Sequence, residues 1–132
     1  MFDNYVLLDK GFKNVKKDGK VIGYELQTFI SYYRGIPISM INTFEVEMDG
    51  EKVPREKIKF SPDGENFFTL DEMTTVTFYK WEYGTPGYIF VEQDGGLKPG
   101  KHKVSLMESI RISYIPVPFI GRSTKELEIK ES

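Results

Sequence analysis

The chain has 132 residues, 18 basic and 20 acidic side chains, and no cysteine. This length suits one domain. The near-even charge argues against a nucleic-acid surface, and the lack of cysteine excludes disulfides, thiolate metal ligands and a cysteine nucleophile. Residues 1–4 show no signal-peptide pattern, and no apolar run approaches the roughly 20 residues that cross a bilayer. We therefore expect one cytoplasmic domain over residues 1–132, not attached to a membrane.

Alternation of apolar and polar residues predicts most of the elements as half-buried β-strands. The alternation is clearest over residues 22–30, 38–48 and 102–114. Glu108 interrupts the apolar face of the third stretch, which a β-bulge or a bend between two sheets would explain. In chain order the predicted strands cover residues 5–8, 22–30, 38–48, 58–60, 67–70, 75–83, 88–92, 102–114 and 125–129.

Asp-Gly pairs at residues 18–19, 49–50 and 63–64 separate several of these stretches. Asp-Gly favours tight hairpin turns because both residues tolerate a positive φ. Only residues 70–74 could begin a helix, of about one turn. Eight or nine short strands at this spacing predict an all-β fold, a two-sheet antiparallel β-sandwich, with an open barrel as the alternative.

Few side chains are candidates for catalysis. His102 is the only histidine, and its use as an acid or base would need a partner from elsewhere in the chain. We expect instead a partly buried histidine with a hydrogen-bonded ring nitrogen. One histidine cannot build a multi-histidine zinc site, and no loop resembles a carboxylate cation site or a phosphate cradle. We predict no catalytic residue and no metal site in this chain.

Several glutamates fall on the predicted solvent faces of strands. Two of them could flank a sugar as the carboxylate pair of a glycosidase does. No feature of the sequence selects a pair, and ordinary solvated strand faces explain the residues better. These glutamates are Glu45, Glu47, Glu82, Glu126 and Glu128.

Residues 32–37 connect two of the clearest strands with an unusual composition. The functional candidates there are Tyr32, Tyr33, Arg34, Ile36 and Pro37. Tyrosine and arginine often anchor protein–protein or sugar contacts because they combine area with hydrogen bonds. We predict that this segment faces a partner or an active site. The alternative is a loop that folds over its own end of the sandwich.

A second connection is almost wholly apolar. It contains Pro116, Val117, Pro118, Phe119 and Ile120. Its prolines disfavour regular strand pairing, and an apolar loop is unfavourable in water unless something covers it. We predict a partner interface here, again with a self-covering loop as the alternative.

Trp81 and Tyr83 share one face of a predicted strand. Such an aromatic ledge can stack on a sugar or on a flavonoid ring. It can equally belong to the core or to an interface, and the sequence leaves these possibilities open.

Seven segments, taken in order, resemble the small β subunit of bacterial C-glycoside deglycosidases over nearly the whole chain. Each segment is weak alone, and their order and spacing carry the likeness. They are Tyr32-Tyr33-Arg34-Gly35, Phe44-Glu45-Val46-Glu47-Met48, Asp49-Gly50-Glu51-Lys52-Val53-Pro54, Thr69-Leu70-Asp71-Glu72-Met73, Trp81-Glu82-Tyr83-Gly84, Gly95-Gly96-Leu97-Lys98-Pro99-Gly100-Lys101-His102 and Arg111-Ile112-Ser113-Tyr114-Ile115-Pro116.

The resemblance implies an accessory subunit of a heteromeric enzyme. That enzyme cleaves the carbon–carbon bond between the sugar and the aromatic aglycone of 3-oxo-C-glycosides of the flavonoid type. The resemblance further implies an α-subunit partner, a TIM barrel similar to sugar-phosphate isomerases, which carries a divalent metal such as manganese and the acid and base groups. The β subunit is expected to be a β-sandwich that packs on this partner and is inactive alone.

Two other functions remain open from the sequence. A carbohydrate-binding module would use Trp81 and Tyr83 as its platform and would bind sugars in isolation. A structural assembly domain would bind a partner without any effect on catalysis.

Overall fold

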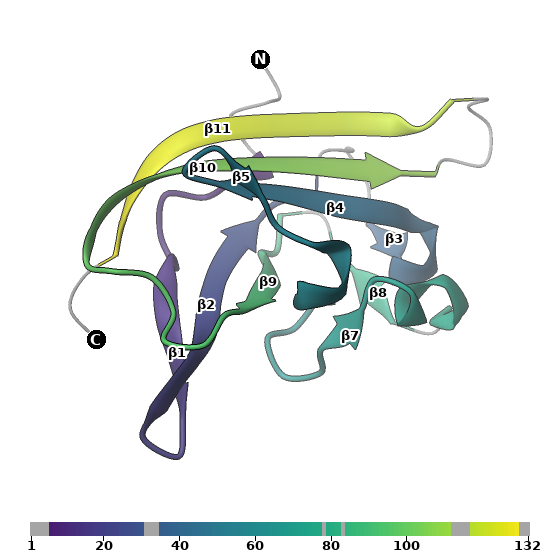
Figure 1. Cartoon of the computed structure of the whole chain (residues 1–132). Helices are drawn as coiled ribbons and strands as arrows, with labels where there is room; N and C mark the ends of the chain where they lie inside the picture. Colours follow the sequence, from purple (N-terminus) through teal and green to yellow (C-terminus); the bar gives the residue numbers. More distant parts are fainter. Residues whose placement is uncertain (1–5, 31–34, 78, 83, 112–116, 130–132) are drawn as a thin grey trace.

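The computed structural model describes residues 6–30, 35–77, 79–82, 84–111 and 117–129 (Figure 1). Two antiparallel sheets face each other across a shared core, and a short strand pair lies beside them. The strands are β1 (Lys13–Lys17), β2 (Lys20–Thr28), β3 (Ile36–Pro37), β4 (Ile41–Met48), β5 (Glu51–Lys52), β6 (Ile58–Ser61), β7 (Phe68–Thr69), β8 (Lys80–Trp81), β9 (Gly87–Glu92), β10 (Gly100–Ile110) and β11 (Phe119–Ile129). Three 3-10 turns join them: η1 (Ile38–Met40), η2 (Arg55–Lys57) and η3 (Glu72–Thr75).

The sheet orders are β1-β2-β9-β6-β7, β11-β10-β4-β5 and β3-β8. This arrangement confirms the predicted all-β, antiparallel sandwich. The described residues hold eleven strands where eight or nine were expected. The strands without a predicted counterpart are β1, β3 and β5, of which β3 and β5 have two residues each and are too short to show a period.

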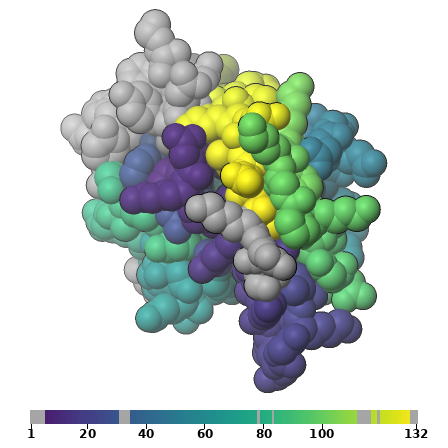
Figure 2. Space-filling model, turned by 90° about the vertical axis from the view of Figure 1, so that its left-hand side faces the viewer, coloured from purple at the N-terminus to yellow at the C-terminus, as the bar shows by residue number. Residues whose placement is uncertain are grey.

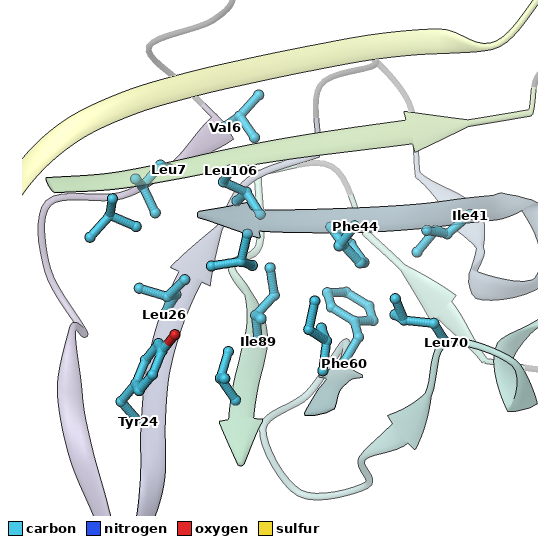
Figure 3. Packing of buried hydrophobic residues seen from close by; sticks show 14 of the residues in the cluster. Val6, Leu7, Tyr24, Leu26, Ile41, Phe44, Phe60, Leu70, Ile89 and Leu106 are labelled. Carbon is cyan, nitrogen blue, oxygen red and sulfur yellow. The ribbon is translucent and has the colours of Figure 1, made fainter. Parts of the chain in front are cut away.

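Side chains from the facing sheets fill the space between them (Figure 3). Tyr24 and Leu26 of β2 and Phe44 of β4 are buried, as their alternation predicts. The rings of Phe44 and Phe60 stack with centroids 4.8 Å apart, which joins the two sheets through aromatic packing. Figure 3 shows both rings pointing into the interior between the ribbons.

Several predicted elements differ from the structure near the N-terminus. Residues 6–8 form no strand; Leu7 makes a single bridge to Thr28, so the strand predicted over residues 5–8 is wrong in its described part. The prediction also misses β1, because Lys13–Lys17 is mostly basic and has no apolar alternation. Pairing with β2 across the Asp18-Gly19 turn makes this segment a strand.

The predicted strand over residues 75–83 is also largely wrong. Residues 72–75 form η3, and of the rest only Lys80–Trp81 is a described strand. The expected helical turn over residues 70–74 does exist, as a 3-10 turn that begins two residues later and ends one residue later. Residues 38–40 likewise form η1, so that β4 begins at Ile41.

β10 and β11 form the longest pairing, with eleven matched residues from Gly100 opposite Ile129 to Ile110 opposite Phe119. The two strands run side by side across one surface of the molecule (Figure 2, green and yellow). β11 begins six residues before the predicted strand of residues 125–129, because Gly121, Arg122 and Ser123 break the apolar alternation.

Glu108 is fully buried in the inner face of β10. The predicted bulge lies beside it, where the pairing of β10 with β4 shifts between Ser109 and Ile110. The carboxylate lies 3.2 Å from the hydroxyl of Thr28 on β2, so a polar contact links the two sheets inside the core.

Candidate functional site

The segment of residues 32–37 is described only from Gly35 onward; Tyr32, Tyr33 and Arg34 lie outside the described residues. Ile36 is buried and Pro37 is half-buried in β3. Ile36 pairs with Trp81 and Pro37 with Lys80. The described end of this segment is therefore held against the body of the sandwich.

Trp81 belongs to the core and does not form an exposed ledge. Its side chain is fully buried, with its ring centroid 4.9 Å from that of Phe60 and 6.3 Å from that of Phe44. The indole N–H donates a hydrogen bond to the carbonyl of Thr85 at 2.8 Å. Stacking of Trp81 on a sugar is thus excluded in this structure, and Tyr83 lies outside the described residues.

The end of the β10–β11 hairpin exposes apolar side chains to solvent. Val117 and Ile120 are 63% and 48% exposed, and they are the only exposed large hydrophobic residues in the described part of the chain. Pro118 is also exposed, while Pro116 and the side chain of Phe119 lie outside the description. The described part of the hairpin end therefore presents two large apolar side chains to solvent, and the interface predicted there stays a prediction.

One group of partly accessible aromatic side chains was not predicted from the sequence. Phe67, Tyr88 and Phe90 are half-buried, and the ring centroids of Phe67 and Phe90 lie 6.5 Å apart. Phe90 covers Gly23, where an added Cβ would come within 2.8 Å of the ring. The glycine in an otherwise alternating strand was the available signal for this close approach.

His102 contacts three separate segments at one end of the sandwich. Its Nδ1 lies 2.6 Å from Oδ2 of Asp49, in the turn between β4 and β5. Its Nε2 lies 2.7 Å from the carbonyl oxygen of Lys98, in the loop between β9 and β10. The ring of Phe12 meets it edge-on at 6.2 Å. The partly buried, hydrogen-bonded histidine expected from the sequence is thus present.

Both partners of this pair have shifted pKa values. Burial of the ring lowers the pKa of His102, but the hydrogen bonds to Asp49 and to the Lys98 carbonyl outweigh it, and the net shift is upward. The hydrogen bond from His102, together with one from the Lys103 amide, lowers the pKa of Asp49. Both shifts favour the ionised pair, which suits a structural contact between the two segments.

A groove of about 440 Å³ opens next to this contact, in the size range of small-molecule sites. One wall is formed by residues 48–57 and the other by residues 91–97. Its apolar lining comes from Met48, Val53, Val91 and Leu97, with charged residues such as Lys57 and Glu92 around them.

Within the described ranges, no three acidic, histidine or cysteine side chains lie close enough together to hold a metal ion. No helix in the same part of the chain is long and apolar enough to cross a membrane.

The comparison with known proteins decides the family. The family model of C-glycoside deglycosidase beta subunits matches residues 2–114. The chain belongs to this family. The match includes residues 32–37, Trp81 and His102, whereas the apolar hairpin end at residues 117–120 lies beyond it. The family expected from the motifs is confirmed.

A curated member of the family is similar to this chain. The C-glycoside deglycosidase beta subunit of Eubacterium cellulosolvens (strain ATCC 43171 / JCM 9499 / 6) is 29% identical over 115 residues. The alignment covers 86% of this chain and 78% of that protein.

Proposed function

We propose that this chain is the accessory beta subunit of a hetero-oligomeric C-glycoside deglycosidase. Membership of the beta-subunit family is the observation that carries the proposal. The substrate class is a 3-oxo-C-glycoside of the flavonoid type, whose carbon–carbon bond between sugar and aglycone is cleaved by elimination, a lyase-type reaction. The complex works in the cytoplasm.

The chemistry of a C-glycoside supports a division of labour between two chains. The scissile bond has no oxygen for an acid to protonate, so the carboxylate pair of a glycosidase would not suffice. A 3-oxo group acidifies the proton on C2, a base removes that proton, and the aglycone then departs. Removing this proton requires an accessible base, and the one histidine of this chain is already hydrogen-bonded at both ring nitrogens.

We assign the metal and the base to an alpha subunit. A divalent ion such as manganese would act there as a Lewis acid, in a TIM barrel of the sugar-phosphate isomerase type. The described residues of this chain gather no set of three acidic or histidine ligands that fits such an ion, so no step of the reaction is routed through a metal held here.

The apolar end of the β10–β11 hairpin is our proposed contact with the alpha subunit. Val117 and Ile120 are large, apolar and exposed, the features of a surface that becomes buried on assembly. They lie at the opposite end of β10 from the Asp49–His102 contact.

Residues 32–37 are proposed to face the active site of the partner. The aromatic and arginine content of the segment supports this role. A Tyr33→Ala/Arg34→Ala variant should still assemble and should release the aglycone more slowly. Full activity of the assembled variant would contradict the proposal.

Co-expression with the candidate alpha subunit tests the function directly. Release of the aglycone from a 3-oxo-C-glycoside, in the presence of manganese, is measured for the two chains together and for each chain alone. We expect release only with both chains. A complex in which the alpha subunit alone is equally active would make this chain a structural assembly domain, and the absence of both complex and release would overturn the proposal.

A further inference from the structure

Two segments that are far apart in the sequence are joined through His102. Asp49 belongs to the tight turn after β4, and Lys98 belongs to the loop before β10. The same two segments continue into the opposite walls of the groove, residues 48–57 and 91–97. The side chain of His102 is 12% exposed, whereas that of Asp49 is 50% exposed, so the ring is the more enclosed partner of this pair.

The chemistry of the two hydrogen bonds requires a charged ring. A backbone carbonyl and an ionised carboxylate both accept hydrogen bonds and cannot donate them. Imidazole carries one N–H when neutral and two when protonated. A neutral His102 would therefore direct a nitrogen lone pair at the Lys98 carbonyl or at the Asp49 carboxylate, and one of the two contacts would become repulsive.

We propose that His102 is a proton-controlled latch, which in its charged form ties the β9–β10 loop to the β4–β5 turn and in its neutral form releases that loop. The released part of the loop directly follows the groove wall of residues 91–97, which stays in place. The proposal concerns the fold of this chain and does not depend on the enzyme to which it belongs.

Of the charged groups near the ring, Asp49 in the β4–β5 turn favours its protonated form. Lys98 precedes the ring in the loop, and Lys101 and Lys103, its neighbours in β10, alternate to the opposite face of the strand; these positive charges do not favour a protonated ring. On β11, Leu127 lies directly opposite, with Glu126 and Glu128 on either side of it. Glu126 forms an ion pair with Lys101 at 3.9 Å. From β2, Tyr24 stays neutral because burial, and then the charge of Asp49, raises its pKa.

Other contacts confine the release to a short piece of chain. The Asn14 side chain donates to the carbonyl of Leu97 and accepts from its amide, both at 2.9 Å. Asp49 also accepts from the amide of Lys103 through Oδ1, which does not depend on the ring. Neither contact changes when His102 loses its proton, and Gly100 stays paired with Ile129 of β11, so the part that is freed is Lys98 and Pro99.

The shift of the His102 pKa from its ordinary value sets the pH range in which the latch opens. Burial opposes the charge on His102, but the hydrogen bonds to Asp49 and Lys98 more than compensate for it and raise the pKa above 6.5. The latch is therefore closed below this raised value and opens as the pH rises through it.

Nitrogen-15 NMR of the full chain tests the latch, because a single histidine gives one unambiguous pair of ring signals. The ring and the backbone amides are followed from about pH 5 to about pH 9. We expect the ring to be doubly protonated at the low end with a midpoint above 6.5, and the amides of Lys98 and Lys101 to shift with the same midpoint. Each unit above the ordinary value means about a tenfold preference of the folded site for the charged ring.

Three variants make the test specific. In His102→Gln the pH-dependent shift of these amides should disappear, and in Asp49→Asn, which keeps the shape of the turn, the ring midpoint should fall. Asn14→Ala is the matched control, because it should loosen the loop equally at every pH. A ring midpoint at or below 6.5, loop amides that do not follow the ring, or an unchanged midpoint in Asp49→Asn would each overturn the proposal. The last measurement stands even if His102→Gln does not fold.

Discussion

Trp81 packs in the core against the rings of Phe60 and Phe44. Gly87 lies so close that an added Cβ would come within 2.6 Å of the Phe60 ring and 3.0 Å of Trp81. Such packing leaves little room for neighbours to collapse into a cavity. Loss of a large side chain here should therefore carry nearly the full cost of the empty space.

We predict that Trp81→Ala lowers the free energy of unfolding by about 3–5 kcal/mol, as measured by urea denaturation followed by circular dichroism. Trp81→Phe, which keeps an aromatic ring, should lose clearly less. In the unaltered chain the fluorescence of this single tryptophan should be that of a buried indole and should not respond to added sugars. A solvent-like emission, or quenching by a sugar, would contradict the core assignment.

Periodicity predicts the burial of residues such as Tyr24, Leu26 and Val46 because their strands are long enough to show it. It gives no answer for Trp81, whose strand has two residues. The sequence likewise predicts a hydrogen-bonded His102 but not the identity of its partners. Asp49 and Lys98 are 53 and four residues away from it along the chain, and only the fold shows that both reach the ring.

At the level of elements, two of the three predicted Asp-Gly turns are tight hairpin turns; Asp63-Gly64 lies in the longer connection between β6 and β7, with a positive φ only at Gly64. The Asp18-Gly19 and Asp49-Gly50 pairs connect β1 to β2 and β4 to β5 with positive φ at both residues: 53° and 78° in the first pair, 54° and 86° in the second. Local chemistry fixes such a turn, since few residues other than glycine and Asp or Asn adopt this conformation readily. The ends of the strands depend on distant partners and were predicted less well, as β1 and β11 show.

Two glycine variants separate the cost of a positive φ from the cost of a steric clash between strands. Gly19→Ala should cost about 1 kcal/mol, because open space surrounds the site and only the positive φ is penalised. Gly23→Ala should cost more, about 1–3 kcal/mol or above, because its Cβ would lie 2.1 Å from the carbonyl oxygen of Val91 and would push β2 from β9. Urea denaturation of both variants measures the difference. Equal costs would mean that the β2–β9 pairing yields more easily than the structure implies.

At the scale of the whole molecule, the groove and the exposed apolar side chains lie at opposite ends of the long hairpin. The latch and the groove lie where β10 begins, whereas Val117 and Ile120 lie where β10 and β11 connect, at the other end of the long hairpin. The sequence predicted an apolar interface at residues 116–120 from composition alone; Val117 and Ile120 are exposed there, and the interface stays a prediction. The sequence could not decide whether Trp81 is exposed or buried in the core. Which side of a short strand faces inward depends on how the sheets assemble.

The apolar hairpin end gives the last prediction. Val117→Ser/Ile120→Ser removes two exposed apolar side chains, so the melting temperature of the isolated chain should change little. If the alpha subunit covers these residues, each contributes about 1–2 kcal/mol to binding, and the double variant should weaken the complex by roughly 30-fold or more. Affinity is measured by titrating the labelled chain with the alpha subunit.

A matched control is Lys16→Ser/Lys17→Ser, which alters two exposed residues of β1 on the other sheet. This variant should bind normally, because its site lies away from the hairpin end. If both variants bind like the unaltered chain, the contact lies elsewhere and residues 32–37 become the first place to look. If only the hairpin variant loses binding while its fold is intact, the exposed valine and isoleucine are explained: they are apolar because the partner covers them.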